Sequence, residues 1–383
     1  MLYNQVFSYK NPIFNKNSIS FVVKNFFSRE FSDGIDQKNI ITLMDSEKVQ
    51  LQKTFSQIQY DPSGSDGYIL MLRKEAYNNF PHRLLKLLES QRVALDIKSY
   101  IIVNNLPFDK ATGSPRINES SLNFKPTHLS ENLIVAFCAV LGEPYSILFE
   151  GGEIVNNLIP HKEHEKEYTG LGSAVELDFH IENAALKYHK DGNMSPTGLA
   201  LNGVKYDEFA NPTPKTRICD SRLALDGLKD YEKEILKGNN YKIKVPMRWR
   251  TSTNQITDPS PIITGCLKQP EVAVAFYPDI VKPISKEASD VLDKFYHNIK
   301  EKSEWVDIKP GTMVYADNRF TMHSRDKFTA SYDENGRGNR WVQRVFVKDS
   351  LWSYRNTKQE KDRVLNPTEP KSYTTKTYGY SER

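Results

Sequence analysis

The chain has 383 residues, 38% of them hydrophobic and 26% charged, so it can bury a sizeable core in water. Its 52 lysines and arginines against 48 acidic residues leave a net charge of only +4, which disfavours a dedicated nucleic-acid binder. The N-terminal residues lack a basic start followed by an apolar run, and no stretch approaches the roughly 20 apolar residues of a membrane span. We therefore expect a soluble, cytoplasmic protein with no membrane partner. Its three cysteines are far apart and odd in number, which favours reduced thiols over disulfides or a zinc cluster.

Helical patterns come first along the chain. Apolar residues recur at helical spacing over 75–95 and again over 129–141. After Gly142 short runs rich in Val, Ile, Phe and Tyr alternate with turn residues, and two further helices are expected at 222–236 and 286–299. Many short strands predict a mainly β fold with flanking helices, a sandwich or barrel rather than alternating strands and helices.

These patterns predict one domain over residues 1–383. Residues 1–140 are its mostly helical flank, and residues 141–348 are its β core. The polar residues 349–383 are expected to form a wrapping or loosely ordered tail. The polar linker 239–261 is a candidate lid or a surface loop.

The histidines point to a metal site. A mononuclear non-haem iron site uses two histidines and one carboxylate, which in sequence reads as His-x-Asp/Glu on one strand and a remote histidine on another. Three such tripeptides occur, namely His161-Lys-Glu163, His180-Ile-Glu182 and His189-Lys-Asp191. In AVELDFHIE, strand alternation directs His180 and Glu182 to the same side, whereas the other two tripeptides lie in polar, turn-like stretches and are expected at the surface. The competing interpretation of His180 is a hydrogen-bonded core histidine.

The remote partner lies late in the chain. The residues there indicate a strand, a turn at Pro310-Gly311, a second strand, a short irregular stretch with His323, and a last strand that carries Arg340 and Arg344 on one face. Two arginines that point inward need anionic partners, and a bidentate guanidinium suits the far carboxylate of a keto-acid cosubstrate. The alternative is an exposed basic strand.

Four stretches together resemble a known family. GLGSAVELDFHIENAALKY, PTGLALNGV, ADNRFTMHSRDKF and GNRWVQRV are similar to clavaminate synthase-like Fe(II)/2-oxoglutarate-dependent dioxygenases, in the branch that hydroxylates free amino acids. The resemblance spans roughly residues 141–348. It implies a double-stranded β-helix (jelly-roll) core, with Fe(II), 2-oxoglutarate and O2 as cofactor and cosubstrates. It also implies that His180, Glu182 and His323 bind the iron, and the presence of Glu182 favours hydroxylation over halogenation.

The resemblance assigns further residues. Arg340 stands in the Arg-Trp pair that usually binds 2-oxoglutarate, whereas Arg337 has the family's spacing of fourteen residues after the second histidine. We choose Arg340 because Arg337 falls in DENGRG, which is typical of a hairpin tip, and Arg337 stays open as the alternative. Arg344 matches the position that holds the substrate's α-carboxylate. Thr216 matches the threonine that supports the far carboxylate of 2-oxoglutarate.

The substrate is inferred from the same resemblance. Glu150 stands where the family supplies a glutamine to the substrate's amino end, and NAALKYHKDGNMSPTGLALNGV is closer to lysine-modifying members. Free L-lysine, hydroxylated at C3 or C4, is therefore expected. Asp279 is expected near the substrate side chain, which leaves L-arginine and ornithine open. A carrier-bound amino acid, a non-catalytic jelly-roll binding protein and a homo-oligomer also stay open.

Overall fold

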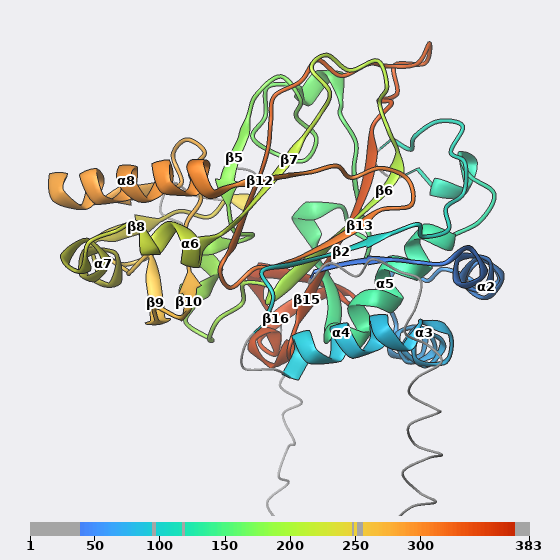
Figure 1. The fold of residues 1–383 in the computed structure, drawn as a ribbon, viewed down its shortest axis with the longest axis horizontal. Coiled ribbons are helices and arrows are strands. Elements are labelled where there is room, and N and C mark those ends of the chain that lie inside the picture. The colour runs from blue at the N-terminus through green and yellow to red at the C-terminus, as the bar shows by residue number, and fades with distance from the viewer. Residues whose placement is uncertain (1–38, 94–96, 117–118, 247–248, 251–255, 372–383) are drawn as a thin grey trace, which may run out of the picture. The chain divides into compact units, whose positions relative to one another are not determined.

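The structure combines helices with several β-sheets (Figure 1). It is a computed structural model that describes residues 39–93, 97–116, 119–246, 249–250 and 256–371. The described helices are α2 (Asp45–Phe55), α3 (Asp66–Asn79), α4 (His82–Val93), α5 (Leu129–Leu141), α6 (Ser221–Asp226), α7 (Asp230–Lys237) and α8 (Lys286–Lys302). Within these ranges, no helix has both the length and the apolar character needed to cross a bilayer.

The large sheet has nine strands. Eight of them follow the order β1 (Ile40–Thr42), β2 (Tyr100–Asn104), β13 (Met313–Asp317), β6 (Gly198–Lys205), β15 (Trp341–Lys348), β3 (Glu143–Ile147), β17 (Val364–Pro370) and β16 (Thr357–Lys361). The ninth, β4 (Asn156–Leu158), pairs with β15. Strands β16 and β17 belong to the predicted tail, whose described part thus extends the sheet rather than being loosely ordered; residues 372–383 lie outside the described residues.

A second sheet of four strands carries much of the site. Its order is β12 (Glu304–Val306), β7 (Thr216–Asp220), β14 (Thr321–Arg325) and β5 (Leu177–His180). Two smaller ribbons pair β8 (Tyr241–Ile243) with β11 (Val281–Pro283), and β9 (Ile263–Cys266) with β10 (Gln269–Val272). From β4 to β7, and again from β12 to β15, successive strands alternate between the large sheet and the four-stranded sheet.

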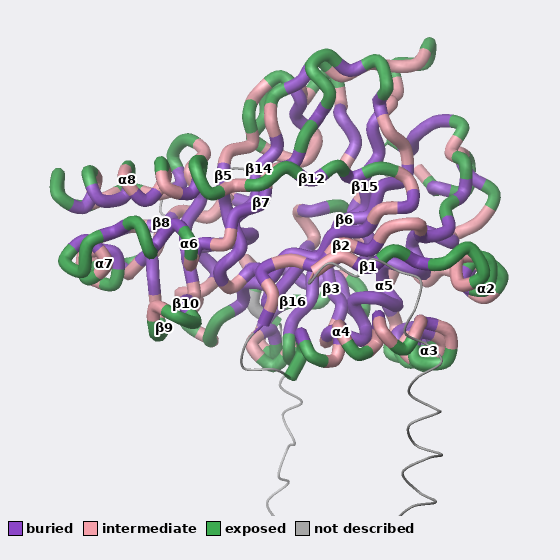
Figure 2. Tube along the Cα trace, in the orientation of Figure 1, coloured by how far each residue is buried: buried purple, intermediate pink, exposed green. Residues whose placement is uncertain are grey.

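Buried residues run through the interior of these layers (Figure 2), and their apolar side chains form three large clusters. Helices α2 to α5 pack on the large sheet through Val345, Val347 and Tyr315, among others. Every residue of α5 is buried, as expected of a helix that is apolar nearly all round. Helix α8 buries a stripe at spacings of three and four residues, from Ala288 to Ile299, against the four-stranded sheet's cluster. Burial of these apolar surfaces is the main stabilising term for this arrangement.

The helix predictions are confirmed at 129–141 and 286–299 and are wrong in detail elsewhere. The pattern over 75–95 is not one helix, because α3 ends at Asn79 and α4 begins at His82. Phe80 between them is extended, at φ −69° and ψ 139°, as expected for the residue before Pro81. The expected helix at 222–236 is likewise two helices. Helix α6 ends at Asp226, with Gly227 after it, and α7 begins at Asp230.

The strand predictions need one correction, at His323, and two strands of the N-terminal segment were not predicted. Strands β1 and β2 lie in the segment predicted to be mostly helical. They were not predicted because a run as short as YIIVN cannot be distinguished from a buried helical segment by its periodicity. His323 lies within strand β14, and the predicted irregular stretch there is wrong. In the candidate lid 239–261, Tyr241–Ile243 forms β8, in agreement with the short strands expected after Gly142, and residues 247–248 and 251–255 lie outside the described residues.

Candidate metal centre

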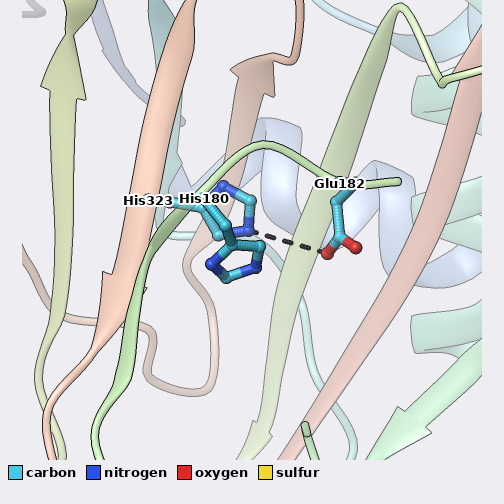
Figure 3. Close-up of side chains that lie close together, drawn as sticks. All are labelled: His180, Glu182 and His323. Atoms are coloured by element: carbon cyan, nitrogen blue, oxygen red, sulfur yellow. Dashed lines mark ion pairs between the residues drawn. The ribbon is translucent and has the colours of Figure 1, made fainter. Parts of the chain in front are cut away.

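Two neighbouring strands bring His180, Glu182 and His323 together (Figure 3). His180 is the last residue of β5, and antiparallel pairing places it directly opposite His323 of β14, with ring centroids 4.2 Å apart. Glu182 follows two residues after His180, and its Oε1 lies 3.6 Å from Nε2 of His323. All three residues are buried, and one potential ligand atom from each lies within 4.8 Å of the others. The alternation that predicted a shared side for His180 and Glu182 agrees with this geometry.

Local hydrogen bonds orient the triad. His180 Nδ1 lies 2.8 Å from the carbonyl oxygen of Asp178, so that nitrogen donates its proton and Nε2 keeps its lone pair for a ligand. The Asn318 side chain accepts a bond from the Glu182 amide at 2.7 Å and donates to the Glu182 carbonyl at 3.1 Å. Asn318 thus fixes the backbone at the carboxylate, just before Asn183 turns the chain at φ +56°.

The charge states also suit a metal. Burial and the neighbouring His323 ring lower the pKa of His180 to about 3, so its imidazole is neutral at neutral pH. Burial opposes ionisation of Glu182, but the Arg344 guanidinium and the His323 hydrogen bond outweigh it and hold the pKa of this carboxyl below its usual range. Two imidazole nitrogens and an ionised carboxylate form the donor set that non-haem Fe(II) prefers, so the residues present fit this metal.

Arg344 links the triad to Glu150. One guanidinium nitrogen of Arg344 donates to Glu182 at 2.6 Å, and another pairs with Glu150. Glu150 is buried in the short 3-10 helix Leu148–Glu150, which follows β3. Arg340, which immediately precedes β15, lines the same cavity as Val342 and Arg344 of β15, so the three residues share a side as predicted. The expected anionic partners of Arg344 are therefore carboxylates of the chain itself.

Two cavities meet near the triad. The inner cavity, of about 60 Å³, is lined by the triad together with Thr216, Arg325, Arg340 and Arg344. The outer cavity, of about 380 Å³, has Glu150 and Glu153 on its wall. Leu158 and Gly170 line both cavities, so the two are adjacent. A small molecule held in the outer cavity therefore lies beside the inner cavity, which the three candidate ligands line.

The other candidate residues are divided by the structure. Arg340 is buried at the inner cavity, whereas Arg337 lies beside the hairpin turn at Gly336 and pairs with Glu119 at 2.5 Å. Asp279 pairs with Lys244 and with Arg250 and lines neither cavity.

The two remaining His-x-Asp/Glu tripeptides lie apart from the inner cavity. His161 is half-buried on the wall of the outer cavity, and half-buried His189 lies 3.8 Å from Asp191. Neither histidine belongs to a cluster of three potential ligands among the described residues.

Sequence reasoning missed Arg325 and Asn318. Arg325 is buried on β14, two residues after His323 and therefore on the same side of that strand. Burial and the positive charge of Arg340 lower the pKa of Arg325 to about 9, while burial lowers that of Arg340 to about 10. The alternation used for Arg340 and Arg344 could have found Arg325 if His323 had been assigned to a strand. No local pattern identifies Asn318.

Comparisons with known proteins give related oxygenases. No protein-family model matches the chain. The chain is 26% identical over 283 residues to an L-asparagine oxygenase of Streptomyces coelicolor, covering 73% of this chain and 79% of that one. A crystal structure of asparagine oxygenase with Fe(II), 2S,3S-3-hydroxyasparagine and succinate matches at a TM-score of 0.73 and 22% identity, covering 86% of this chain and 99% of the other. A crystal structure of the non-heme iron oxygenase OrfP with Fe and alpha-ketoglutaric acid matches at a TM-score of 0.71 and 20% sequence identity. The match covers 85% of this chain and 100% of the other. The structural matches show a shared fold.

Proposed function

We propose that the protein is an Fe(II)/2-oxoglutarate-dependent dioxygenase that hydroxylates a free L-amino acid. The observation that carries this proposal is the convergence of His180, Glu182 and His323 in one buried cavity that also receives Arg340 and Arg344. A metal held by two histidines and one carboxylate keeps open positions for a keto acid and oxygen. The sequence similarity to an L-asparagine oxygenase supports the same class of reaction.

The two main sheets are the two halves of a double-stranded β-helix, or jelly roll. The support is the alternation of strands: β4, β15, β6 and β13 adjoin in the large sheet, and β5, β14, β7 and β12 adjoin in the smaller one. Apolar side chains from both sheets form one cluster, which includes Leu201, Val314 and Val342 from the large sheet and Ile218 and Val306 from the smaller one. In such a fold one end of the sandwich provides a cavity for ligands.

The residues of the inner cavity divide the chemical work. His180, Glu182 and His323 would hold Fe(II), and the bound metal with 2-oxoglutarate would supply O2 activation, in which one oxygen atom goes to the substrate and the other to succinate with release of CO2. Arg340 binds the far carboxylate of 2-oxoglutarate, with the hydroxyl of Thr216 beside it. Burial of both side chains excludes water and strengthens this charge-assisted contact.

Arg344 orients the amino acid. It binds the substrate's α-carboxylate, and Glu150 binds the α-ammonium group. Glu150 and Glu182 both contact the Arg344 guanidinium, so a substrate carboxylate competes with them for its five N–H donors. When the substrate's α-carboxylate takes the place of Glu150 on the guanidinium, the buried charge of Arg344 stays neutralised. Glu150 is then free to pair with the substrate's α-ammonium group.

We propose L-lysine as the substrate, with hydroxylation at C3 or C4. The support beyond the family resemblance is the pair of carboxylates Glu150 and Glu153 on the wall of the outer cavity, which Arg116 and Lys361 also line. Burial raises the pKa of Glu153, so a cation beside it would recover part of the desolvation cost. L-Arginine and ornithine also carry a side-chain cation, whereas L-asparagine, the substrate named for the relative, does not. Phe149 on the same wall stacks on Trp249 of the candidate lid at 5.7 Å.

A direct assay tests the proposal. The protein is incubated with Fe(II), 2-oxoglutarate and each standard amino acid or ornithine, and mass spectrometry follows a gain of one oxygen atom while succinate is quantified. We expect one hydroxylated product with one succinate per turnover, and the largest yield with L-lysine. His323→Ala should abolish both products, and His189→Ala is the matched control, since His189 belongs to a similar tripeptide outside the inner cavity.

The outcomes separate the reaction from its substrate. If another free amino acid is hydroxylated instead, the proposed oxygenase activity stands and L-lysine is wrong as the substrate. If the protein is active only when the amino acid is tethered to a carrier, the substrate is a carrier-bound amino acid and not a free one. Wild-type protein that forms neither product nor succinate with any of these substrates refutes the enzyme and leaves a binding protein.

A further inference from the structure

The inner cavity contains a third buried arginine, besides Arg340 and Arg344, at the end of strand β14. Arg325 lies two residues after His323, lines the same cavity as the triad, and is only 7% exposed. Most buried arginines are satisfied by a carboxylate, because an unpaired buried charge is costly. Arg325 makes no ion pair with a carboxylate in the part of the chain that the structure describes.

The contacts that Arg325 does make are weak. Its guanidinium donates to the carbonyl oxygens of Ser173 at 3.4 Å, Val175 at 3.3 Å and Asp326 at 3.4 Å. All three distances exceed the usual range for an N–H···O bond. Its Nε is buried and has no hydrogen-bond partner among the described residues. The side chain thus keeps donor capacity for a ligand.

Arg340 is likewise buried at the inner cavity, close to Arg325. Both guanidiniums lie near the ring of Phe328, with centroid distances of 5.4 Å for Arg325 and 5.9 Å for Arg340, and the two charges repel each other. Asp207 attracts Arg340 from a distance but accepts its own hydrogen bonds from the amide and hydroxyl of Ser331. Within the described ranges, no carboxylate forms an ion pair with Arg340 either.

We propose that Arg325 and Arg340 form a paired guanidinium site that binds one carboxylate, the far carboxylate of the dicarboxylate cosubstrate. A carboxylate has two oxygens and about four acceptor positions, so it can accept hydrogen bonds from two guanidiniums at once. One anion between them removes their mutual repulsion and supplies the missing acceptors. This inference rests on the proposed function, to which it adds Arg325 as a second residue that selects a dicarboxylate over a monocarboxylate.

Calorimetry with two keto acids tests the paired site. Fe(II)-loaded protein is titrated without oxygen with 2-oxoglutarate and with 2-oxobutyrate, which has the same metal-binding end but no far carboxylate. We expect Arg325→Gln to weaken 2-oxoglutarate roughly 10- to 100-fold and to leave 2-oxobutyrate unchanged. Arg325→Lys, which keeps the charge but loses the planar fork, should give a smaller loss of the same selectivity. Arg337→Gln is the matched control, with unchanged affinity for both keto acids.

Each outcome decides between the two proposals. If Arg325→Gln binds both keto acids as wild type does, or loses affinity for both equally, the paired site is wrong while the proposed function stands. If Arg325→Gln does not fold, the same comparison is made on Arg325→Lys. Wild-type protein that binds neither keto acid refutes the proposed function, and the paired site with it.

Discussion

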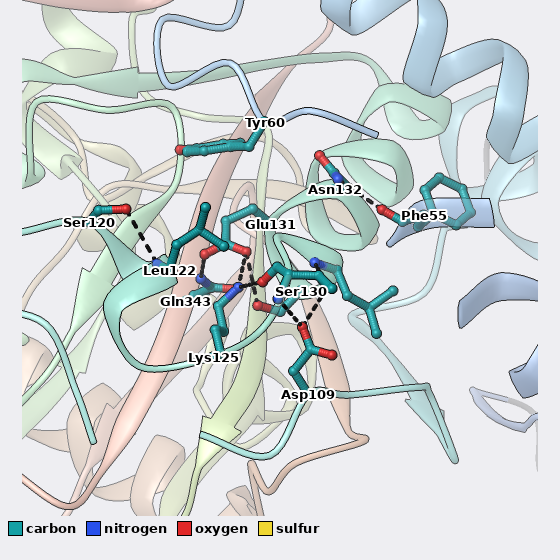
Figure 4. A network of polar contacts seen from close by, with 12 residues as sticks. Phe55, Tyr60, Asp109, Ser120, Leu122, Lys125, Ser130, Glu131, Asn132 and Gln343 are labelled. Carbon is teal, nitrogen blue, oxygen red and sulfur yellow. Dashed lines mark hydrogen bonds and ion pairs between the residues drawn. The ribbon is translucent and has the colours of Figure 1, made fainter. Parts of the chain in front are cut away.

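A buried ion pair on the outer side of the large sheet gives the sharpest test of the packing (Figure 4). Lys125 Nζ lies 2.5 Å from Glu131 at the start of α5, and both side chains are almost fully buried. Gln343 of β15 donates to the other oxygen of Glu131 at 2.8 Å, and Ser130 donates to the first at 3.2 Å. Burial opposes ionisation of Glu131, but Lys125 outweighs it and lowers the pKa of this carboxyl. The perturbation we choose is Lys125→Met, which removes only the cation.

The size of the effect follows from two estimates. Removing one partner of a buried pair typically costs about 3–5 kcal/mol in the free energy of unfolding. Glu131 can limit this loss by taking up a proton, which from an unfolded-state pKa near 4.3 costs about 3.7 kcal/mol at pH 7 and about 1 kcal/mol at pH 5. In the wild type the pKa of Glu131 is lowered, so its contribution is fully present above the unfolded-state pKa and is lost only as the pH falls through the lower folded-state pKa. The destabilisation of Lys125→Met should therefore shrink by about 2.7 kcal/mol between pH 7 and pH 5.

Urea unfolding at both pH values measures this difference. The control is the double variant Lys125→Met/Glu131→Gln, which has no buried charge and should be more stable than Lys125→Met at pH 7, with a stability difference from wild type that varies little with pH. A Lys125→Met destabilisation that is the same at pH 7 and pH 5 would refute the reasoning, because it would mean that Glu131 is not the group left uncompensated.

Three further predictions concern the site and its frame. Arg340→Gln should raise the KM for 2-oxoglutarate roughly 10- to 100-fold in a succinate-release assay, whereas Arg337→Gln should leave it unchanged; the reverse pattern would transfer the role to Arg337. Glu150→Gln should raise the KM for L-lysine with little change in the 2-oxoglutarate KM, and an equal rise in both would indicate a structural defect instead. Gly203→Ala should lower the free energy of unfolding by about 1–3 kcal/mol in urea melts, because its Cβ would overlap the backbone carbonyl of Lys309; unchanged stability would mean that the backbone there yields freely.

The sequence allowed part of the site to be predicted because strand alternation is local. His180 and Glu182 are two residues apart, and Arg340 and Arg344 are four apart, so an extended chain directs each pair to one side whatever the rest of the fold does. The pairing of His323 with His180 is a long-range register that was not predicted, and the resemblance to a family implied only that His323 joins the triad. The short-strand pattern after Gly142 likewise predicted sheets without their order.

The remaining features depend on contacts that no local pattern encodes. The pairing of Glu150 with Arg344 joins a 3-10 helix to strand β15, and the bond from Gln343 to Glu131 joins the same strand to helix α5. Helix breaks were a different kind of error, since Pro81 is visible in the sequence and the apolar period was given more weight than the residue that interrupts it.

Strand β15 connects the outer polar network to the inner cavity. All eight of its residues are buried, and alternation directs Gln343 to the Glu131 side and Arg344 to the triad side. These two residues are adjacent, so a shift of the strand that follows loss of the Glu131 bond moves the Arg344 guanidinium as well. We therefore expect Lys125→Met to raise the KM for the amino acid more than that for 2-oxoglutarate, and the double variant with Glu131→Gln to reverse part of this rise. Steady-state kinetics that show the same relative KM change for both substrates would contradict transmission through Arg344.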